Sequence, residues 1–191
     1  MPKIILASAS PRRKQILKNA GIDFEIHASS FDEKLKSQDF SEEIAENFAL
    51  NKAKDISEKF PDDIVISADT VVVFDNKIFM KPKDKKDAFC MLKTLSGKTH
   101  FVQTSICMLY AGKKLLKSVK TFVTFKELSD ELINYYIEKF NPLDKAGAYG
   151  IQELPDGFVE SVEGDFENVI GISSSVVKEM LRTIKNHEFK N

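Results

Sequence analysis

The feature that most constrains this 191-residue chain is an apolar, β-branched run from Ile64 to Phe74. A run of this kind is typical of a buried core strand. The turn residues 75–77 follow it and lead into a second short strand, predicted over 78–80. Because a hairpin leaves the core strand, the sheet is expected to contain antiparallel neighbours.

Helical and strand patterns alternate along the rest of the chain. The segment 145–171 is rich in Gly and acidic residues, has no helical period, and is predicted as loops and short strands. This mixture predicts an α/β fold, with helices flanking a mixed twisted sheet. The other predicted strands are 3–7, 24–28, 100–110 and 114–125, and the predicted helices are 11–20, 41–60, 85–95, 130–140 and 174–185.

Length and charge limit the class of protein. A chain of this size with 42% hydrophobic residues is expected to form one domain over 1–191. Its 28 basic and 29 acidic residues leave a net charge of -1, so it lacks the basic field of a sequence-independent nucleic-acid binder. The start, Ile4–Ala7, is shorter than a signal peptide's apolar region, and no apolar run is long enough for a membrane span. The sequence therefore predicts a cytoplasmic protein without nucleic-acid or membrane partners.

Cysteines and histidines give no metal or disulfide pattern. Cys90 and Cys107 lie 17 residues apart and are both predicted to be buried thiols rather than zinc ligands or a disulfide. His27, His100 and His187 lie far apart in the sequence, so neither a zinc site nor a Ser-His-Asp triad is expected.

Two adjacent arginines stand at the start of a predicted helix. Only three of the 28 basic residues are arginines, and Arg12 and Arg13 follow directly on Pro11, with Ser10 as the helix cap. Cations in a first helical turn oppose the helix dipole. An anion held between the free backbone N–H groups and the two guanidinium groups would reverse that penalty. The alternative is a pair of solvated surface arginines.

Lys52 and Asp69 place charges where the pattern predicts burial. Lys52 projects from the apolar stripe of the 41–60 helix, where an ammonium is costly unless it is paired, faces a cleft or reaches solvent at the stripe's edge. Asp69 interrupts the most apolar segment of the chain, so its carboxylate needs a metal, a cation or hydrogen-bond donors unless it belongs to a turn or a helix cap. Glu33, otherwise an ordinary loop acid, could join Asp69 around a hard divalent cation.

Two further segments carry weaker signals. Lys81 precedes Pro82, which restricts the lysine's backbone and holds it at a strand end. The segment 144–152 places small residues around one aromatic and ends on Gln152. This composition suits close backbone approach and hydrogen bonding to the edge of a base, and a Gly-rich structural turn is the alternative.

With these residues, the chain resembles the Maf family of nucleotide pyrophosphatases, also called septum-formation proteins. The fold of that family is similar to the fold of inosine triphosphate pyrophosphatases, which implies two lobes around a central cleft. One departure is Ile172-Ser173, where the family often has Leu-Pro, and it bears on how the last helix begins. The resemblance runs nearly end to end and rests on Leu6-Ala7-Ser8-x-Ser10-Pro11-Arg12-Arg13, Ala49-Leu50-x-Lys52-Ala53, Ala68-Asp69-Thr70-Val71-Val72, Lys81-Pro82, Met91-Leu92-x-x-Leu95-Ser96-Gly97, Asp144-Lys145-Ala146-Gly147-x-Tyr149-x-Ile151-Gln152 and Gly164-Asp165-x-x-Asn168-Val169.

The resemblance also implies roles for single residues. Asp69 would be the proton acceptor and lie near a Mg²⁺ or Mn²⁺ ion, with Glu33 as a second metal partner. The side chains expected to contact a triphosphate are Ser8, Arg13, Lys52 and Lys81. The positions that mark the branch of the family acting on dTTP and UTP are Arg12, Thr70 and Gln152.

The implied activity is hydrolysis of nucleoside triphosphates to a monophosphate and pyrophosphate. In that reaction the cations and the metal ion would stabilise the phosphate charge while Asp69 orients or deprotonates a water molecule. A nucleotide-binding regulator of cell division without turnover is the alternative. It would need the cations and the pocket but not the pair of acids. The resemblance further implies a homodimer.

Overall fold

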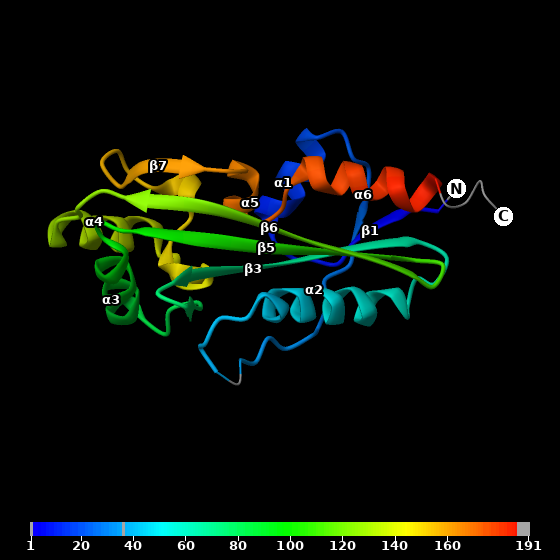
Figure 1. The fold of residues 1–191 in the computed structure, drawn as a ribbon, viewed down its shortest axis with the longest axis horizontal. Coiled ribbons are helices and arrows are strands. Elements are labelled where there is room, and N and C mark those ends of the chain that lie inside the picture. The colour runs from blue at the N-terminus through cyan, green and yellow to red at the C-terminus, as the bar shows by residue number, and fades with distance from the viewer. Residues whose placement is uncertain (1, 36, 187–191) are drawn as a thin grey trace.

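The computed structural model describes residues 2–35 and 37–186, so that His187 lies outside the described residues. Within these ranges the chain forms a seven-stranded sheet with helices on both faces (Figure 1). The strands are β1 Ile4–Leu6, β2 Glu25–Ile26, β3 Ile64–Phe74, β4 Lys77–Phe79, β5 Thr99–Tyr110, β6 Lys113–Phe125 and β7 Val159–Glu163. The helices are α1 Pro11–Asn19, α2 Glu42–Ser57, α3 Lys85–Leu95, α4 Asp130–Phe140, α5 Phe166–Ile170 and α6 Ser174–Asn186.

The sheet is mixed, as the sequence predicts. Its order is β2-β1-β3-β5-β6-β7, and β4 pairs with β3 outside this path. The strands β2, β1 and β3 are parallel, whereas β3, β5, β6 and β7 pair antiparallel with their neighbours. The predicted α/β fold with a mixed sheet and flanking helices is therefore confirmed.

The alternation of side chains along β3 decides what each face of the sheet meets. Ile64, Ile66 and Ala68 pack in one core with α1 and α6, while Val65 packs against α2 on the other face. Successive side chains of a strand point to opposite faces. Asp69 therefore faces the α2 side and the next residue, Thr70, faces the α1 side. Two consecutive residues of β3 thus supply polar side chains to opposite faces of the sheet.

The hydrophobic core is divided between the two ends of the long strands β3, β5 and β6. Toward one end, α3 and α4 pack with the aromatic side chains of Phe125 and Phe158. Toward the other end, α1 and α6 cover one face of the sheet and α2 covers the opposite face (Figure 1). The two predicted lobes correspond to these separate cores, which share one continuous sheet.

Two sequence predictions were wrong in part. The segment 145–171 holds two short 3₁₀ turns, at 146–148 and 151–153, and the helix α5 besides the strand β7, and a further 3₁₀ turn at 142–144 precedes it. Five residues are too few to show a helical period. Asp165 caps α5, because its Oδ1 accepts hydrogen bonds from the backbone N–H groups of Glu167 and Asn168. The other error concerns Cys90, which is exposed, whereas Cys107 is buried as predicted.

The last helix begins at the departure from the family pattern. Ser173 Oγ accepts a hydrogen bond from the backbone N–H of Val176 at 3.4 Å, and the Ser173 carbonyl accepts one from Val177 N–H at 3.1 Å. A serine hydroxyl is a common cap for the free N–H groups of a helix start. The serine that stands in place of proline therefore starts α6 by capping it.

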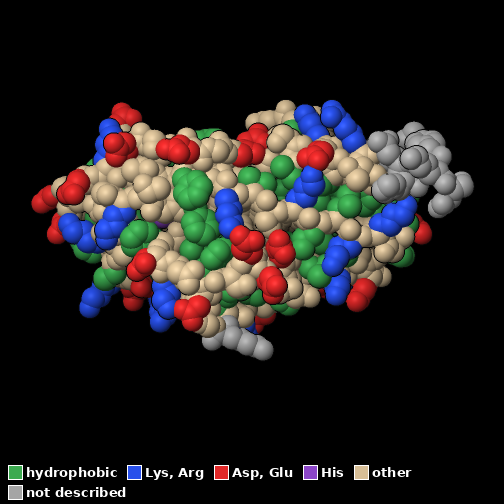
Figure 2. Space-filling view, viewed as in Figure 1, with side chains coloured by type: hydrophobic (Ala, Val, Ile, Leu, Met, Phe, Trp, Pro, Cys, Tyr) green, Lys and Arg blue, Asp and Glu red, His purple; other side chains and the backbone are tan. Residues whose placement is uncertain are grey.

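The surface carries charges of both signs. Figure 2 shows lysines, arginines and acidic side chains interspersed over the face in view, with apolar side chains between them. Exposed ion pairs of the molecule include Lys117 with Glu179 and Lys85 with Glu138. None of the helices in the described ranges combines the length and apolar character that a membrane crossing requires.

Candidate active site

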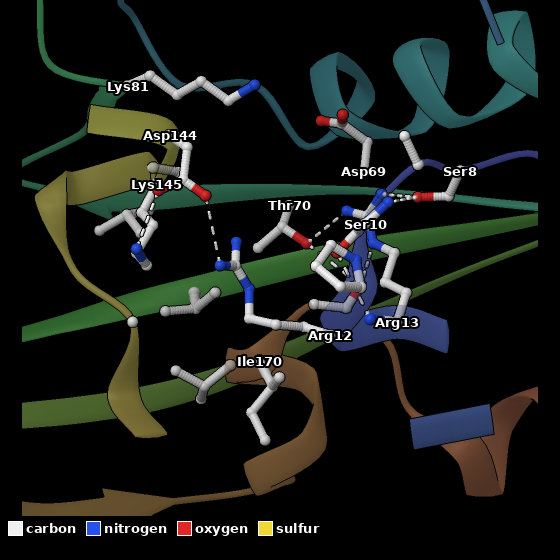
Figure 3. Close-up of a pocket in the computed structure, with 18 of the residues that line it drawn as sticks. Ser8, Ser10, Arg12, Arg13, Asp69, Thr70, Lys81, Asp144, Lys145 and Ile170 are labelled. Atoms are coloured by element: carbon white, nitrogen blue, oxygen red, sulfur yellow. Dashed lines mark hydrogen bonds and ion pairs between the residues drawn. The ribbon is translucent and has the colours of Figure 1, made fainter. Parts of the chain in front are cut away.

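A cavity of about 420 Å³ lies between the two lobes. Its volume is within the range of small-molecule sites in proteins. The lining comes from the β1–α1 turn, α2, β3 and the segment 144–153, and Figure 3 shows these elements converging. All nine site residues predicted from the sequence line this one cavity: Ser8, Arg12, Arg13, Glu33, Lys52, Asp69, Thr70, Lys81 and Gln152.

The turn between β1 and α1 is held by its own serines. Ser10 caps α1 by accepting a hydrogen bond from the backbone N–H of Arg13 at 3.4 Å, and Pro11 occupies the first helical position. Ser8 Oγ accepts from Ser10 N–H at 3.2 Å and from Arg13 Nη1 at 3.3 Å. The turn therefore holds the Arg13 side chain at the cavity wall.

Arg13 is a partly buried cation with neutral partners. Besides Ser8, its acceptors are the Gly171 carbonyl, 2.8 Å from Nε, and Thr70 Oγ1, 3.2 Å from Nη2. Within residues 2–35 and 37–186 no carboxylate forms an ion pair with it. Desolvation lowers the pKa of Arg13, and the nearby charges of Asp69 and Glu33 offset only part of this effect. A cation held in this way is suited to an anionic ligand.

Lys52 joins the two predicted acids. Its Nζ lies 2.5 Å from Asp69 Oδ1 and also contacts Glu33 Oε1. Lys52 is buried on the α2 stripe with Ala49 and Ala53, so the alternative of a lysine that reaches solvent at the stripe's edge is wrong. The ammonium instead neutralises two carboxylates that the fold brings to one point.

The two acids respond differently to their surroundings. Asp69 is only 4% exposed, and burial raises its pKa despite the charge of Lys52. Burial opposes ionisation of Glu33 as well, but the charges of Lys52, Lys81 and Arg13 outweigh it and hold the Glu33 pKa below its ordinary value. Two neighbouring carboxyl groups with pKa values shifted in opposite directions are typical of acid–base sites.

Three other predicted residues line the cavity with less constraint. Lys81 is exposed and has no ion-pair partner in the described part of the chain. Arg12 Nη1 lies 3.6 Å from Asp144 Oδ2, so this pair bridges the α1 side and the 144–153 side of the cavity (Figure 3). Gln152 is exposed within the 3₁₀ turn Ile151–Glu153.

The segment 144–153 approaches the sheet closely. A Cβ on Gly147, whose φ is 66°, would lie 2.9 Å from Val72 Cγ1, so this position requires glycine. Tyr149 is anchored by a 2.7 Å hydrogen bond between its hydroxyl and His100 Nε2. Lys145 is buried against Gly150. Its ammonium group forms ion pairs with Asp144, which precedes it, and with Glu153, which follows it in the segment.

Several residues at the site stand in no sequence pattern that would predict their role. Gly171 acts through its backbone carbonyl, and His100 and Tyr149 act as a buried pair from distant segments. Lys145 belongs to the family motif, yet a lysine beside an aspartate in a loop indicates nothing by itself. These residues become neighbours only when the chain is folded.

The acids also decide which metal the site could hold. No group of three or more His, Cys, Asp or Glu side chains within the described ranges could bind a metal by itself. Glu33 and Asp69 nevertheless converge on one point, Lys52 Nζ. Mg²⁺ is commonly bound by one or two carboxylates together with water and substrate phosphates. The donor set therefore fits a hard divalent cation that a phosphate ligand helps to bind.

Fold and site together define an α/β protein with an interlobe cavity, in which an uncompensated arginine adjoins a lysine-bridged pair of acids. The chain belongs to the Maf family, since the model of that family, described as Maf-like protein, matches residues 3–184.

Similar proteins include a dTTP/UTP pyrophosphatase of Thermosipho africanus, which is 49% identical over 94% of this chain and 92% of its own length. A dTTP/UTP pyrophosphatase of Clostridium botulinum is 46% identical over 94% of this chain and 97% of its own. Among solved structures, a nucleoside-triphosphatase or dITP/XTP pyrophosphatase of Mycobacterium abscessus matches 66% of this chain and 75% of its own, with 12% identity and a TM-score of 0.46.

Proposed function

We propose that this protein hydrolyses nucleoside triphosphates, dTTP and UTP foremost, to the nucleoside monophosphate and pyrophosphate. The observation that carries the proposal is the cavity's pairing of Arg13, a cation with only neutral protein partners, with the buried acid Asp69. The names of the Thermosipho and Clostridium relatives support the same substrates.

In the proposed mechanism the cations bind the triphosphate. Arg13 would donate to phosphate oxygens with the N–H groups that its protein partners leave free, and Lys81 would add a second positive charge from the opposite rim. Ser8 would contact the phosphates from the β1–α1 turn. Positioning and charge neutralisation supply most of the catalysis in phosphoryl transfer.

Asp69 is the proposed proton acceptor. Its carboxylate would orient and deprotonate the water molecule that attacks the α phosphorus. Lys52, 2.5 Å from Asp69 Oδ1, favours the ionised form that a base requires, against the burial that raises the Asp69 pKa. A Mg²⁺ or Mn²⁺ ion held by Glu33 and Asp69 would supply further positive charge beside the phosphates and acidify water.

Arg12, Thr70 and Gln152 are proposed to set the preference for dTTP and UTP. Gln152 stands exposed at the cavity's rim, where its amide could donate to and accept from a pyrimidine edge. Arg12 and Thr70 adjoin the phosphate end of the cavity. The proposal extends, from the family resemblance, to a homodimer in the cytoplasm.

The test measures pyrophosphate release from dTTP, UTP, CTP, GTP and methylated GTP by purified protein, with and without Mg²⁺ or Mn²⁺. Metal-dependent release mainly from dTTP and UTP, with the monophosphate as co-product, is expected. Activity that persists in EDTA would contradict the metal assignment. Nucleotide binding without turnover on any substrate would favour a regulator of cell division instead.

A further inference from the structure

Asn168 belongs to a family motif that the proposed mechanism leaves unused. It is fully buried on α5, and all of its side-chain hydrogen-bonding groups have partners. Its Oδ1 accepts from Thr104 N–H at 3.1 Å, and its Nδ2 donates to the Val102 carbonyl at 3.0 Å and to Thr121 Oγ1 at 2.9 Å. The amide therefore fastens α5 to the strands β5 and β6.

Further hydrogen bonds link Asn168 to the cavity through the hydroxyl groups of Thr104 and Thr70. Thr104 Oγ1 donates to the backbone carbonyl of Asn168 at 2.9 Å. Thr70, which pairs with Thr104 across β3 and β5, has its own hydroxyl oxygen 2.9 Å from Thr104 Oγ1. Arg13 Nη2 in turn lies 3.2 Å from Thr70 Oγ1.

The direction of this chain of hydrogen bonds is fixed at its far end. A carbonyl can only accept, and a hydroxyl carries a single proton. Thr104 Oγ1 donates its single proton to the Asn168 carbonyl. Thr70 Oγ1 must therefore be the donor in the hydrogen bond between the two threonines. The competing acceptor for Thr70, the Gly171 carbonyl, is farther away at 3.4 Å. Thr70 therefore presents a lone pair to Arg13, and consecutive bonds of one direction strengthen one another.

The C-terminal end of α5 reaches Arg13 by a second route. Gly171 ends this helix, and its carbonyl accepts from Arg13 Nε at 2.8 Å. With Ser8 as the third acceptor, three of the five guanidinium N–H groups donate to the protein, and two remain for a ligand. A single short helix thus determines the orientation of the guanidinium from two sides.

We propose that Asn168 and Thr104 are positioning residues for Arg13. By anchoring α5 and fixing the direction of the Thr104–Thr70 hydrogen bond, they hold the guanidinium with two free N–H groups toward the cavity. The consequence for triphosphate binding rests on the proposed function, whereas the constraint on Arg13 is a property of the protein without ligand.

The first test needs no substitution. The chain has only three arginines, so their side-chain Nε–H signals can be assigned in the NMR spectrum of the ¹⁵N-labelled protein. Exchange of the Arg13 Nε–H with water is expected to be at least about tenfold slower than that of the exposed Arg182, because the Gly171 carbonyl accepts this proton. Equal exchange rates would overturn the inference.

The second test compares three hydroxyl variants. T104V removes the hydroxyl in the chain to Arg13, T104S keeps it, and T124V removes a hydroxyl of β6 that contacts Thr99 and takes no part in anchoring α5. T104V is expected to speed exchange at Arg13 Nε–H and to raise the KM for dTTP about tenfold, with a smaller change in kcat. T104S is expected to restore both values. T124V is expected to lower the melting temperature at most, while the KM stays within about twofold.

The outcomes separate the two proposals. A protein that turns over dTTP but shows the same Arg13 exchange and KM in T104V as in T124V would refute the positioning role and leave the function intact. If no nucleotide is hydrolysed but T104V alone loosens Arg13, the positioning role stands and the proposed function fails.

Discussion

Arg13 and Lys145 are cations of the same cavity, but they lie on opposite walls and are balanced in different ways. Lys145 Nζ lies 2.9 Å from Asp144 Oδ1 and 3.1 Å from Glu153 Oε2, both in its own segment. Arg13 has only hydroxyl and carbonyl acceptors. A buried cation that is already paired with carboxylates has its charge satisfied within the protein, whereas one with neutral acceptors keeps its charge for a ligand. Burial alone therefore does not identify a binding cation.

The same contrast separates the acids of the two walls. Asp69 is bridged to Glu33 by Lys52, beside the cations that are proposed to bind phosphate. Glu153, on the opposite wall, pairs with Lys145 within one short segment. We interpret the first wall as the site of chemistry and the second as a support that shapes the nucleoside end.

The largest predicted difference is between Asp69→Asn and Glu153→Gln. Asp69→Asn removes the proposed base and is expected to lower kcat by about 10²- to 10⁴-fold, while calorimetry still detects nucleotide binding. Glu153→Gln is the matched control on the opposite wall, and its kcat is expected to stay within about threefold. Near-normal turnover by Asp69→Asn would remove Asp69 from its assigned role.

The next largest effect compares Arg13→Gln with Lys145→Gln. The loss of charge-assisted hydrogen bonds to the triphosphate is expected to raise the KM for dTTP about 10- to 100-fold in Arg13→Gln. Lys145→Gln is expected to lower the free energy of unfolding, because it leaves Glu153 without its cation and Asp144 with Arg12 alone, but to change the KM only a fewfold. Steady-state kinetics and urea titrations measure both quantities. A larger rise in KM for Lys145→Gln would reverse the assignment of the two walls.

A pH effect of intermediate size tests the support wall. Burial lowers the pKa of His100 to about 4, from an ordinary value of 6.5. Between these values the unfolded chain binds a proton that the folded protein does not, so stability is lost as the pH falls. Between pH 6.5 and 5 this loss amounts to about 2 kcal/mol for His100. The free energy of unfolding of His100→Gln should depend less steeply on pH over this interval, and an unchanged dependence would contradict the pKa shift.

The smallest predicted effect concerns the choice of base. Gln152→Ala is expected to lower the preference for dTTP and UTP over CTP by about two- to tenfold, since one or two neutral hydrogen bonds are lost. The inhibition constant of tripolyphosphate as a competitive inhibitor should hardly change, because Gln152 lies away from the Arg13 wall. An unaltered ranking of the nucleotides would exclude base recognition by Gln152.

The two walls also differ in how far the sequence could predict them. Lys52 and Asp69 place charges where the apolar pattern predicts burial, and Arg13 places one against the helix dipole; these conflicts make them candidates for a functional role. Lys145 and Tyr149 lie in an irregular segment with no period to violate. Tyr149 is anchored by a hydrogen bond with His100 from a distant strand, and Lys145 pairs with two carboxylates that come together only when its own segment folds.

The secondary-structure elements also differ in how far the sequence predicts them. The long strands and helices are confirmed because apolar periodicity fixes them, whereas α5 is too short to leave such a pattern. Thr104 is an ordinary strand residue in the sequence, and Gly171 contributes only a backbone carbonyl. Their links to Arg13 become visible only when β3, β5 and α5 are placed together.

The most direct test of the account is hydrolysis of dTTP by the purified protein in water enriched in oxygen-18. The proposed mechanism predicts dTMP and pyrophosphate as products, with the heavy oxygen in the dTMP phosphate, because water attacks the α phosphorus beside Asp69. Heavy oxygen in the pyrophosphate, or stepwise release of single phosphates, would contradict it.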